Sequence, residues 1–252
     1  MSYCIAISLN EGMLFCSDSR ISQPDNTYTT QSKLFRFEQA PDRKFVILTA
    51  GNQITGRATM DQLSRDITNM AQTNLNTVNT IAEAADYVGD VYREQLLGFE
   101  AITPDLESTF LLGGQIRGSR HRVVKIYAAG NNITSSRDTP FLQIGESKYG
   151  TPILERIITR TTSLDTAALC SLVSMCSTMN SDQAVGPPVE LMLYKTDSFE
   201  LVNYHFFDEN SEFLKNLNKL WADKLLEAFH QMPPLAWASS WEKISDKSSG
   251  IY

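Results

Sequence analysis

The order in which strand-like and helix-like segments follow one another constrains this chain more than any single motif. Short apolar runs typical of strands come first, and two stretches with apolar residues at helical spacing follow them. Strands then return, followed by two more helices, two strands and a last helix. Blocks of antiparallel strands separated by blocks of helices indicate an α+β fold. We expect a four-layer α-β-β-α sandwich, because two antiparallel sheets stacked between helix layers would bury every apolar face.

The predicted strands are short and bounded by turn residues. They cover residues 3–9, 13–18, 33–38, 44–51, 109–114, 122–129, 141–145, 189–195 and 199–206. The predicted helices are defined by apolar residues recurring at near-helical intervals. They cover about 54–70 and 78–96, a stretch that starts near Pro152, one that follows Asp165, and about 213–228.

The chain has 252 residues, enough to bury one sizeable core. We predict a single domain over residues 1–231 and a C-terminal extension over 232–252. The extension has no clear period, and it carries Trp237 and Trp241 among polar residues. Two interpretations fit this composition: a disordered tail, or a tail that docks on a neighbouring subunit.

Charge and composition exclude several kinds of partner and site. A net charge of −7 argues against binding nucleic acid or an anionic membrane surface, because phosphate groups select clustered Lys and Arg. No apolar stretch approaches the roughly 20 residues that span a bilayer, and no signal segment opens the chain, so we expect a cytoplasmic protein. The 4 cysteines lack paired spacing, and the 3 histidines lie far apart. We therefore expect reduced core thiols, no metal site and no cofactor.

The first two predicted strands bring a serine and a carboxylate into one neighbourhood. Residues 3–9 and 13–18 flank Asn10-Glu11-Gly12, which is typical of a hairpin turn. If Leu9 lies opposite Met13, then Cys4 lies opposite Asp18. Ser2 becomes a diagonal neighbour of Asp18, about 7–8 Å away between backbones.

Ser2 directly follows Met1, and aminopeptidases remove a methionine that precedes a small residue. We therefore expect a mature chain whose first residue carries both a free amine and a hydroxyl. An α-amino group has a pKa of about 7.7–8.0, so it can accept the hydroxyl proton directly or through water. This arrangement needs no histidine. Because many unrelated proteins begin with Met-Ser, the prediction depends on the residues that accompany Ser2.

Four features of the first half occur together: Ser2, the motif SDSR at 17–20, Lys33 within QSKLF, and LTAG at 48–51. The second half adds LLGG at 111–114, KIYAAG at 125–130, IGESKYG at 144–150 and STMNSDQAVGPPVEL at 177–191. In order and approximate spacing, residues 1–206 resemble the proteasome-type beta subunits of the N-terminal-nucleophile hydrolases. The Met-Ser start, IGESKYG and VGPP are most similar to the bacterial ancestral-beta-subunit (Anbu) homologues. The resemblance implies the N-terminal-nucleophile hydrolase fold.

The resemblance also implies roles for individual residues. Ser2 is the nucleophile and the base, and the Gly51 N–H helps to stabilise the oxyanion. Beside them, Asp18 and Lys33 form a charged pair. The residues expected to position the terminal amine are Ser147 and Asp182, with Asn180 or Ser181 as alternatives to Asp182. Thr49 and Gln53 are candidates for binding the substrate side chain.

Each of these residues also has an interpretation without catalysis. Lys33 could be an ordinary charge at a strand edge, Ser147 a helix cap, and Asp182 a surface turn residue. The resemblance favours hydrolysis of amide or peptide bonds through an acyl-enzyme on Ser2. It also implies self-assembly into a ring or spiral, so the expected partners are further copies of the chain and a peptide or amide substrate. The alternative is a proteasome-like scaffold subunit whose catalytic site is vestigial.

Overall fold

The computed structural model describes residues 2–22, 27–99, 103–235 and 237. Helices and antiparallel sheets alternate along the chain in the predicted order, so the α+β class is confirmed. The helices are α1 (Gln53–Thr68), α2 (Ile81–Leu96), the 3-10 helix η1 (Pro104–Leu106), α3 (Thr151–Ile157), α4 (Leu164–Ser181) and α5 (Glu212–His230).

Two sheets of five strands carry the fold, and all of their strand pairs are antiparallel. The first sheet contains, in spatial order, β10 (Phe141–Gly145), β1 (Tyr3–Ser8), β2 (Gly12–Asp18), β11 (Val189–Lys195) and β12 (Asn203–Phe207). The second contains β5 (Leu34–Phe37), β6 (Arg43–Gly51), β7 (Ser108–Ile116), β8 (Arg122–Ile126) and β9 (Asn132–Thr134). A separate ribbon pairs β3 (Arg20–Ser22) with β4 (Tyr28–Thr30).

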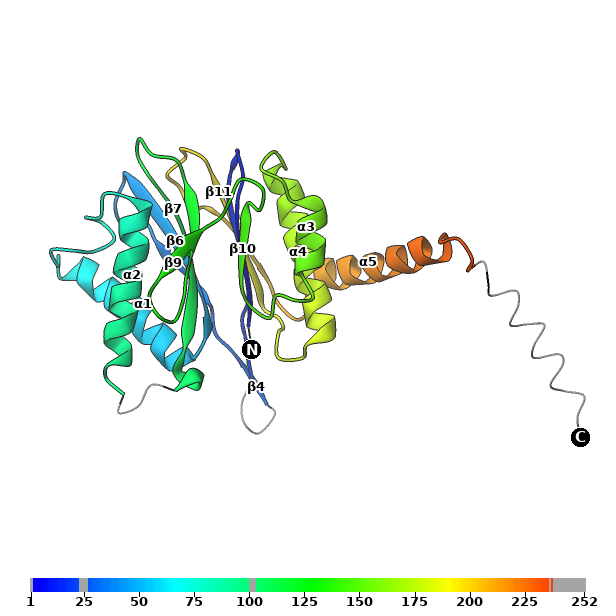
Figure 1. The fold of residues 1–252 in the computed structure, drawn as a ribbon, viewed down its shortest axis with the longest axis horizontal. Helices are drawn as coiled ribbons and strands as arrows, with labels where there is room; N and C mark the ends of the chain where they lie inside the picture. Colours follow the sequence, from blue (N-terminus) through cyan, green and yellow to red (C-terminus); the bar gives the residue numbers. More distant parts are fainter. Residues whose placement is uncertain (1, 23–26, 100–102, 236, 238–252) are drawn as a thin grey trace, which may run out of the picture. The chain divides into compact units, whose positions relative to one another are not determined.

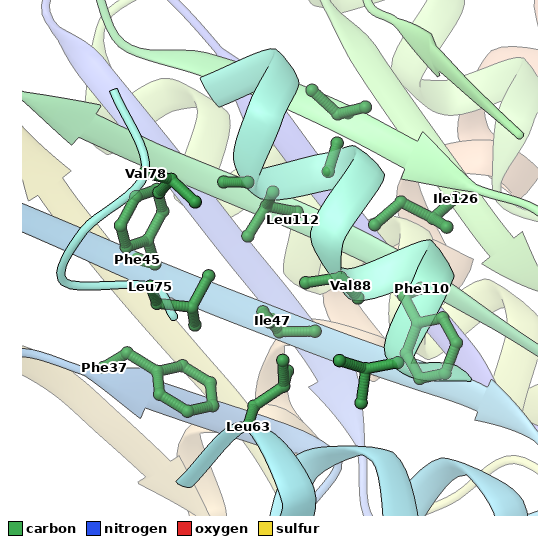
Figure 2. Close-up of a cluster of buried hydrophobic side chains, with 14 of the residues drawn as sticks. Phe37, Phe45, Ile47, Leu63, Leu75, Val78, Val88, Phe110, Leu112 and Ile126 are labelled. Atoms are coloured by element: carbon green, nitrogen blue, oxygen red, sulfur yellow. The ribbon is translucent and has the colours of Figure 1, made fainter. Parts of the chain in front are cut away.

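One apolar core lies between the second sheet and the helices α1 and α2, which cover its outer face (Figure 1). Every second residue of β6 and β7 points to this side, because strand side chains alternate between faces. Figure 2 shows Phe45 and Ile47 of β6 with Phe110 and Leu112 of β7, facing Val88 of α2. The apolar stripes that predicted α1 and α2 are therefore the surfaces that bury this sheet.

A second apolar core joins the two sheets face to face. Ala6 and Phe15 from the first sheet pack with Val46, Leu48 and Leu111 from the second. On its other face the first sheet contacts α4, and the hydroxyls of Tyr3 in β1 and Ser174 in α4 lie 2.8 Å apart in a hydrogen bond. Since both faces of β1 and β2 are covered, every residue of these two strands is buried.

The predicted register of the first hairpin is wrong by one residue. Met13 lies opposite Ser8, not Leu9, and Cys4 lies opposite Ser17, not Asp18. The reason is the turn: the Leu9 N–H donates to the Gly12 oxygen at 2.8 Å, so the connection has two residues, Asn10 and Glu11, instead of three. Asp18 consequently shifts by one position along β1, toward the end at which Ser2 lies.

Other elements also differ from the prediction; the strand predicted over residues 122–129, for example, ends at Ile126, and the unpredicted strand β9 follows it. The polar segment after Asp18 contains the ribbon β3–β4, whose strands of three residues each are too short to show an apolar pattern. Helix α2 begins at Ile81, although Val78 continues the apolar period as a buried loop residue. The strand predicted from residue 199 begins at Asn203, because Phe199 has a φ of 51° and so leaves the extended conformation.

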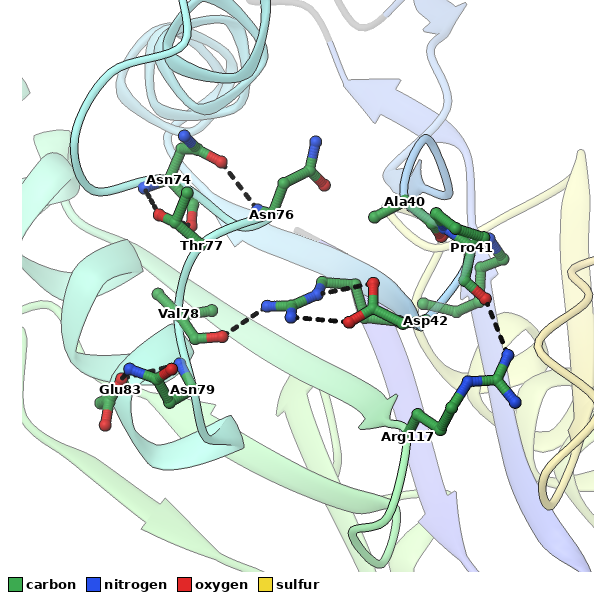
Figure 3. A network of polar contacts seen from close by, with 12 residues as sticks. Ala40, Pro41, Asp42, Asn74, Asn76, Thr77, Val78, Asn79, Glu83 and Arg117 are labelled. Atoms are coloured by element: carbon green, nitrogen blue, oxygen red, sulfur yellow. Dashed lines mark hydrogen bonds and ion pairs between the residues drawn. The ribbon is translucent and has the colours of Figure 1, made fainter.

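Arg43, the first residue of β6, fixes the loop that leads into α2. Its guanidinium donates to the carboxylate of Asp42 at 2.8 Å and to the carbonyl of Val78. Nearby, Arg117 donates to the carbonyl of Pro41 at 3.2 Å (Figure 3). Val78 is thus held by its backbone as well as by its buried side chain.

By its internal contacts the chain divides into two compact units, Met1–Leu214 and Lys215–Tyr252. The first unit contains both sheets and α1 to α4, whereas most of α5 belongs to the second. The predicted boundary after residue 231 stays a prediction, and most of the predicted extension, including Trp241, lies outside the described residues. Over the part of the chain that the structure describes, no helix has the length and apolarity to cross a membrane.

Candidate active site

Asp18, the last residue of β2, is fully buried and lies against the start of the chain. Its Oδ1 accepts a hydrogen bond from the backbone N–H of Tyr3 at 2.9 Å and another from Nζ of Lys33 at 2.8 Å. Its Oδ2 accepts from the Gly186 N–H at 3.3 Å. The predicted proximity of Ser2 and Asp18 thus exists despite the register error, because the carboxylate binds the peptide that joins Ser2 to Tyr3.

Lys33 directly precedes β5 and brings a positive charge from the second sheet to Asp18 in the first. It is only 6% exposed, and its Nζ also donates to the carbonyl of Arg20 at 2.8 Å. Its own carbonyl accepts from the Thr49 N–H at 3.1 Å, which ties Lys33 to β6. The interpretation of Lys33 as an ordinary charge at a strand edge is therefore wrong.

Opposing effects act on the carboxyl of Asp18. Burial raises its pKa above the ordinary 3.8, while the Lys33 ammonium and the N–H groups of Tyr3 and Gly186 act in the opposite direction. Burial is the largest effect, so the pKa stays raised. The donors that surround the carboxylate stabilise its charged form, which would be costly in this site without them.

Ser2 is held through its backbone by the end of β10. The Ser2 carbonyl accepts from the Glu146 N–H at 2.7 Å. Gly145 has a φ of 78°, and a Cβ at that position would lie 1.8 Å from the Ser2 oxygen. Only glycine fits this approach, which explains the glycine in the motif IGES.

Ser147 lies two residues beyond Gly145 and is half-buried. Its carbonyl accepts from the Thr151 N–H at 2.9 Å. The N-cap residue of α3 is Gly150, so the interpretation of Ser147 as a helix cap is wrong. Its predicted role toward the terminal amine stays a prediction, although the segment that carries it is anchored to Ser2.

Asp182 is the C-cap residue of α4, and its Oδ1 accepts from the Ala184 N–H at 2.8 Å. The carboxylate therefore shapes the turn after α4, as its turn interpretation requires. That turn leads to Gly186, whose N–H binds Asp18. The role of Asp182 in positioning the terminal amine stays a prediction, as do the alternative assignments to Asn180 and Ser181.

The predicted oxyanion and substrate residues surround the end of β6. Gly51 has a φ of 111°, and a Cβ there would lie 2.3 Å from the Glu107 oxygen, so the backbone itself requires glycine. Thr49 and Gln53 line one surface pocket together with Lys33. The other residues of this pocket are Ile21, Gln31, Ser32, Phe35 and Arg57. The structure thus brings the two predicted substrate residues together beside the charged pair.

Sequence reasoning missed Glu190, a 3% exposed carboxylate in β11. It accepts hydrogen bonds from the hydroxyls of Ser19 at 2.8 Å, Ser32 at 3.0 Å and Tyr204 at 2.8 Å. Ser19 follows Asp18 and Ser32 precedes Lys33, so Glu190 holds both segments of the ion pair. The signal was available, since an acidic residue inside the apolar run VELML needs a buried partner.

Chemically, this end of the sheets combines a buried ammonium, a carboxylate and the backbone of Ser2. An ammonium fixed at such a place stabilises negative charge that develops on a nearby oxygen. Among the residues described, no group of three His, Cys, Asp or Glu side chains is arranged to hold a metal ion. The residues gathered here are of the kind that serves acyl transfer from an amide.

No protein-family model matches the chain, and no curated protein matches it. Solved structures do match over nearly the whole chain. "Anbu (ancestral beta-subunit) from Yersinia bercovieri" is 38% identical with a TM-score of 0.87, covering 92% of this chain and 99% of that one. "Helical Assembly of the Anbu Complex from Pseudomonas aeruginosa" is 34% identical with a TM-score of 0.89, covering 94% of this chain and 99% of that one. Anbu from Hyphomicrobium sp. strain MC1 is 33% identical with a TM-score of 0.86, covering 92% of this chain and 99% of that one. With these identities over almost complete chains, the protein belongs to the Anbu (ancestral beta-subunit) family of proteasome-like beta subunits.

Proposed function

We propose that this protein is an N-terminal-nucleophile hydrolase that cleaves amide or peptide bonds through an ester on Ser2 once Met1 is removed. The proposal includes the four-layer α-β-β-α architecture of such enzymes, with α1 and α2 as one outer layer and α3 and α4 as the other. The contacts of α1 and α2 with the second sheet, and of α4 with the first, support this arrangement.

The observation that carries the proposal is the buried pair of Lys33 and Asp18 at the peptide between Ser2 and Tyr3. Replacing a buried ion pair by apolar residues is often neutral or stabilising, so fold stability does not require one here. A subunit with only a structural role has no need for an ammonium next to the first residues of the chain. An enzyme that generates negative charge on a hydroxyl oxygen does need one.

In the proposed reaction, Oγ of Ser2 attacks the amide carbonyl while the free α-amine of Ser2 takes the hydroxyl proton. The tetrahedral intermediate collapses, the C–N bond breaks, and the α-ammonium gives its proton to the leaving amine. Water then attacks the ester, again losing a proton to the amine, and the acid product leaves as Ser2 regains its hydrogen. Atoms and charges balance without any further reactant.

Each predicted site residue has a place in this scheme. Lys33 stabilises the alkoxide as it forms and favours the neutral form of the terminal amine, while Asp18 holds Lys33 in position. The Gly51 N–H binds the oxyanion, and Ser147 and Asp182 position the amine. Thr49 and Gln53 receive the substrate side chain, since they line the same pocket as Lys33.

The proposal extends to assembly and cellular compartment. A relative from Pseudomonas aeruginosa is described as a helical assembly, and we expect this chain to associate with further copies of itself into a spiral or ring. Cys4, Cys16, Cys170 and Cys176 are buried free thiols, which suits the reducing cytoplasm.

Intact mass spectrometry tests the proposal directly. The native protein is weighed before and after incubation with an epoxyketone or β-lactone, electrophiles that react with terminal serine or threonine nucleophiles. We expect the mass of the chain without Met1 and, after incubation, a single adduct that peptide mapping places on residue 2. Ser2→Ala should lose Met1 equally well and gain no adduct. Retained Met1, or no adduct on a processed chain, would instead support a scaffold with a vestigial site.

A further inference from the structure

A second pocket lies at the opposite ends of the strands that carry the candidate active site. Five chain segments line it, and they come from the β1–β2, β7–β8 and β11–β12 turns, the start of the β9–β10 connection and the α3–α4 loop. Its volume of about 950 Å³ is within the range of small-molecule sites. Ser2 directly precedes β1 and Ser8 is its last residue, so the pocket is roughly 20 Å from the proposed nucleophile, at about 3.3 Å per residue.

The pocket is strongly basic in an acidic protein. Four arginines line it, and the one carboxylate in its lining is Asp197, whose Oδ1 is already bound by Gln115 Nε2 at 2.7 Å. Four guanidinium groups and one carboxylate leave a charge of +3, against −7 for the whole chain. In the described part of the chain none of these arginines forms an ion pair. They are Arg120, Arg122, Arg137 and Arg160.

Two buried polar atoms of the lining residues have no partner. Across the described residues four buried side-chain polar atoms are unpaired, and two of them are Oγ of Ser8 and Nε of Arg160. Buried donors are nearly always satisfied in proteins, by the chain itself or by something bound to it. Both ring nitrogens of His121, another lining residue, do have partners: Nε2 is 2.8 Å from the Leu9 oxygen and Nδ1 is 3.2 Å from Oγ1 of Thr196. Of the polar groups that line the pocket, the guanidinium groups without an ion-pair partner are the ones suited to bind an anion.

We propose that this pocket binds a multiply charged phosphate compound of small-molecule size, held by the guanidinium groups of Arg122, Arg137 and Arg160. A guanidinium presents parallel N–H groups that match two oxygens of one phosphate. Several such groups without counter-ions favour a ligand with several negative charges. The ligand joins turns from both sheets, so its binding stabilises the folded protein by mass action.

Isothermal titration calorimetry of the purified protein with inorganic pyrophosphate tests the proposal, at constant ionic strength and in a phosphate-free buffer. We expect saturable binding with one site per chain and a rise in the melting temperature that grows with ligand concentration. Citrate, a carboxylate of similar charge, is titrated in parallel and should bind more weakly. Absent pyrophosphate binding would overturn the proposal, and tighter binding of citrate would overturn the phosphate assignment.

Substitutions locate the site. Arg160→Gln and Arg137→Gln should each raise the dissociation constant of pyrophosphate about tenfold, the loss expected for one charge-assisted hydrogen bond. Arg137 is exposed, so its variant should fold even if Arg160→Gln does not. The matched control is Arg65→Gln on α1, where the exposed guanidinium of Arg65 donates to Gln62. Equal binding by all three variants would place the anion elsewhere. Ser2→Ala should bind normally, so failure of the hydrolase proposal leaves this test unaffected.

Discussion

The Asp18 carboxylate is bound by groups from three distant parts of the sequence: the first peptide, the segment before β5 and the loop after α4. Such a residue has energetic consequences larger than those of surface charges. A buried ion pair stabilises the fold little relative to apolar residues, but removal of one partner leaves an uncompensated charge.

Asp18→Asn should therefore lower the free energy of unfolding by about 3–5 kcal/mol, because Lys33 loses its counter-ion while remaining buried. Urea titration followed by circular dichroism measures the change. The double variant Asp18→Asn/Lys33→Met removes both charges and should recover most of the loss, yet it should form no adduct with the electrophile. A cost below 1 kcal/mol for the single variant would mean that water reaches Lys33 in solution.

His121 supplies a dependence of stability on pH. Burial lowers its pKa below the ordinary 6.5, so between the folded and unfolded pKa values the unfolded chain binds the additional proton. The contribution of neutral His121 to the free energy of unfolding is complete above pH 6.5. It is lost as the pH falls from there toward the pKa of His121 in the folded protein.

His121→Gln should reduce this loss, since glutamine can still donate to Leu9 and accept from Thr196 but cannot titrate. We expect the difference in unfolding free energy between wild type and variant to change by at most about 1.4 kcal/mol per pH unit below 6.5. Urea titrations from pH 7.5 to 5 measure it. A constant difference across this range would contradict the assignment.

Among the elements, those with long apolar patterns could be predicted from the sequence, and those set by turn geometry could not. The stripes of α1 and α2 and the apolar runs of β6 and β7 predicted the correct elements, because burial dictates both pattern and position. The first hairpin was shifted by one residue, because apolar runs buried on both faces of the sheet do not reveal which residues are paired. The start of α2 was predicted at Val78, three residues too early, because buried loop residues are also apolar.

The N-terminus of α2 is determined by capping instead. Thr80 is the N-cap residue, its hydroxyl accepts from the Glu83 N–H at 3.0 Å, and the Glu83 carboxylate accepts from the Asn79 N–H at 2.8 Å. Thr80→Ala should lower the free energy of unfolding by about 1 kcal/mol, because the first turn loses an acceptor. Thr80→Ser keeps the oxygen and should cost much less in the same urea titration. Equal costs for both variants would show that the methyl group of Thr80, not its oxygen, matters.

On the scale of the whole molecule, the sequence predicted the fold class, and the residues proposed for the site lie around one end of the two sheets. Asp18 could be predicted to lie near Ser2 from the first hairpin, whereas the roles of Lys33, Thr49 and Gly51 were implied by the family resemblance of the motifs that contain or adjoin them. The hydrogen bonds of Glu190 to Ser32 and of Gly186 to Asp18 were beyond prediction, since they join segments far apart in the sequence. Spacing along a chain carries no information about such contacts.

Assembly is tested at this scale. Helix α5 exposes Leu225, Leu226 and Phe229 by 51%, 57% and 71%, which is unusual for large apolar side chains of neighbouring helical turns. If copies of the chain associate through this surface, Leu226→Glu/Phe229→Glu should reduce the particle mass measured by light scattering after size-exclusion chromatography. The melting transition of the Met1–Leu214 unit should remain. Glu227→Gln is the control, and an unchanged mass in the double variant would assign assembly to another surface.

The ion pair of Asp18 and Lys33 joins two sheets whose shared core is mostly apolar, with a few further polar contacts such as the hydrogen bond from Tyr194 to Gln115. Apolar contacts have no direction, so one sheet can slide slightly over the other at little cost, whereas a 2.8 Å contact between charged atoms cannot follow such a movement. The alignment of the two sheets is therefore a condition for the chemistry proposed at Ser2. A mutation deep between the sheets, far from the substrate pocket, should therefore abolish the proposed hydrolysis while the protein remains folded.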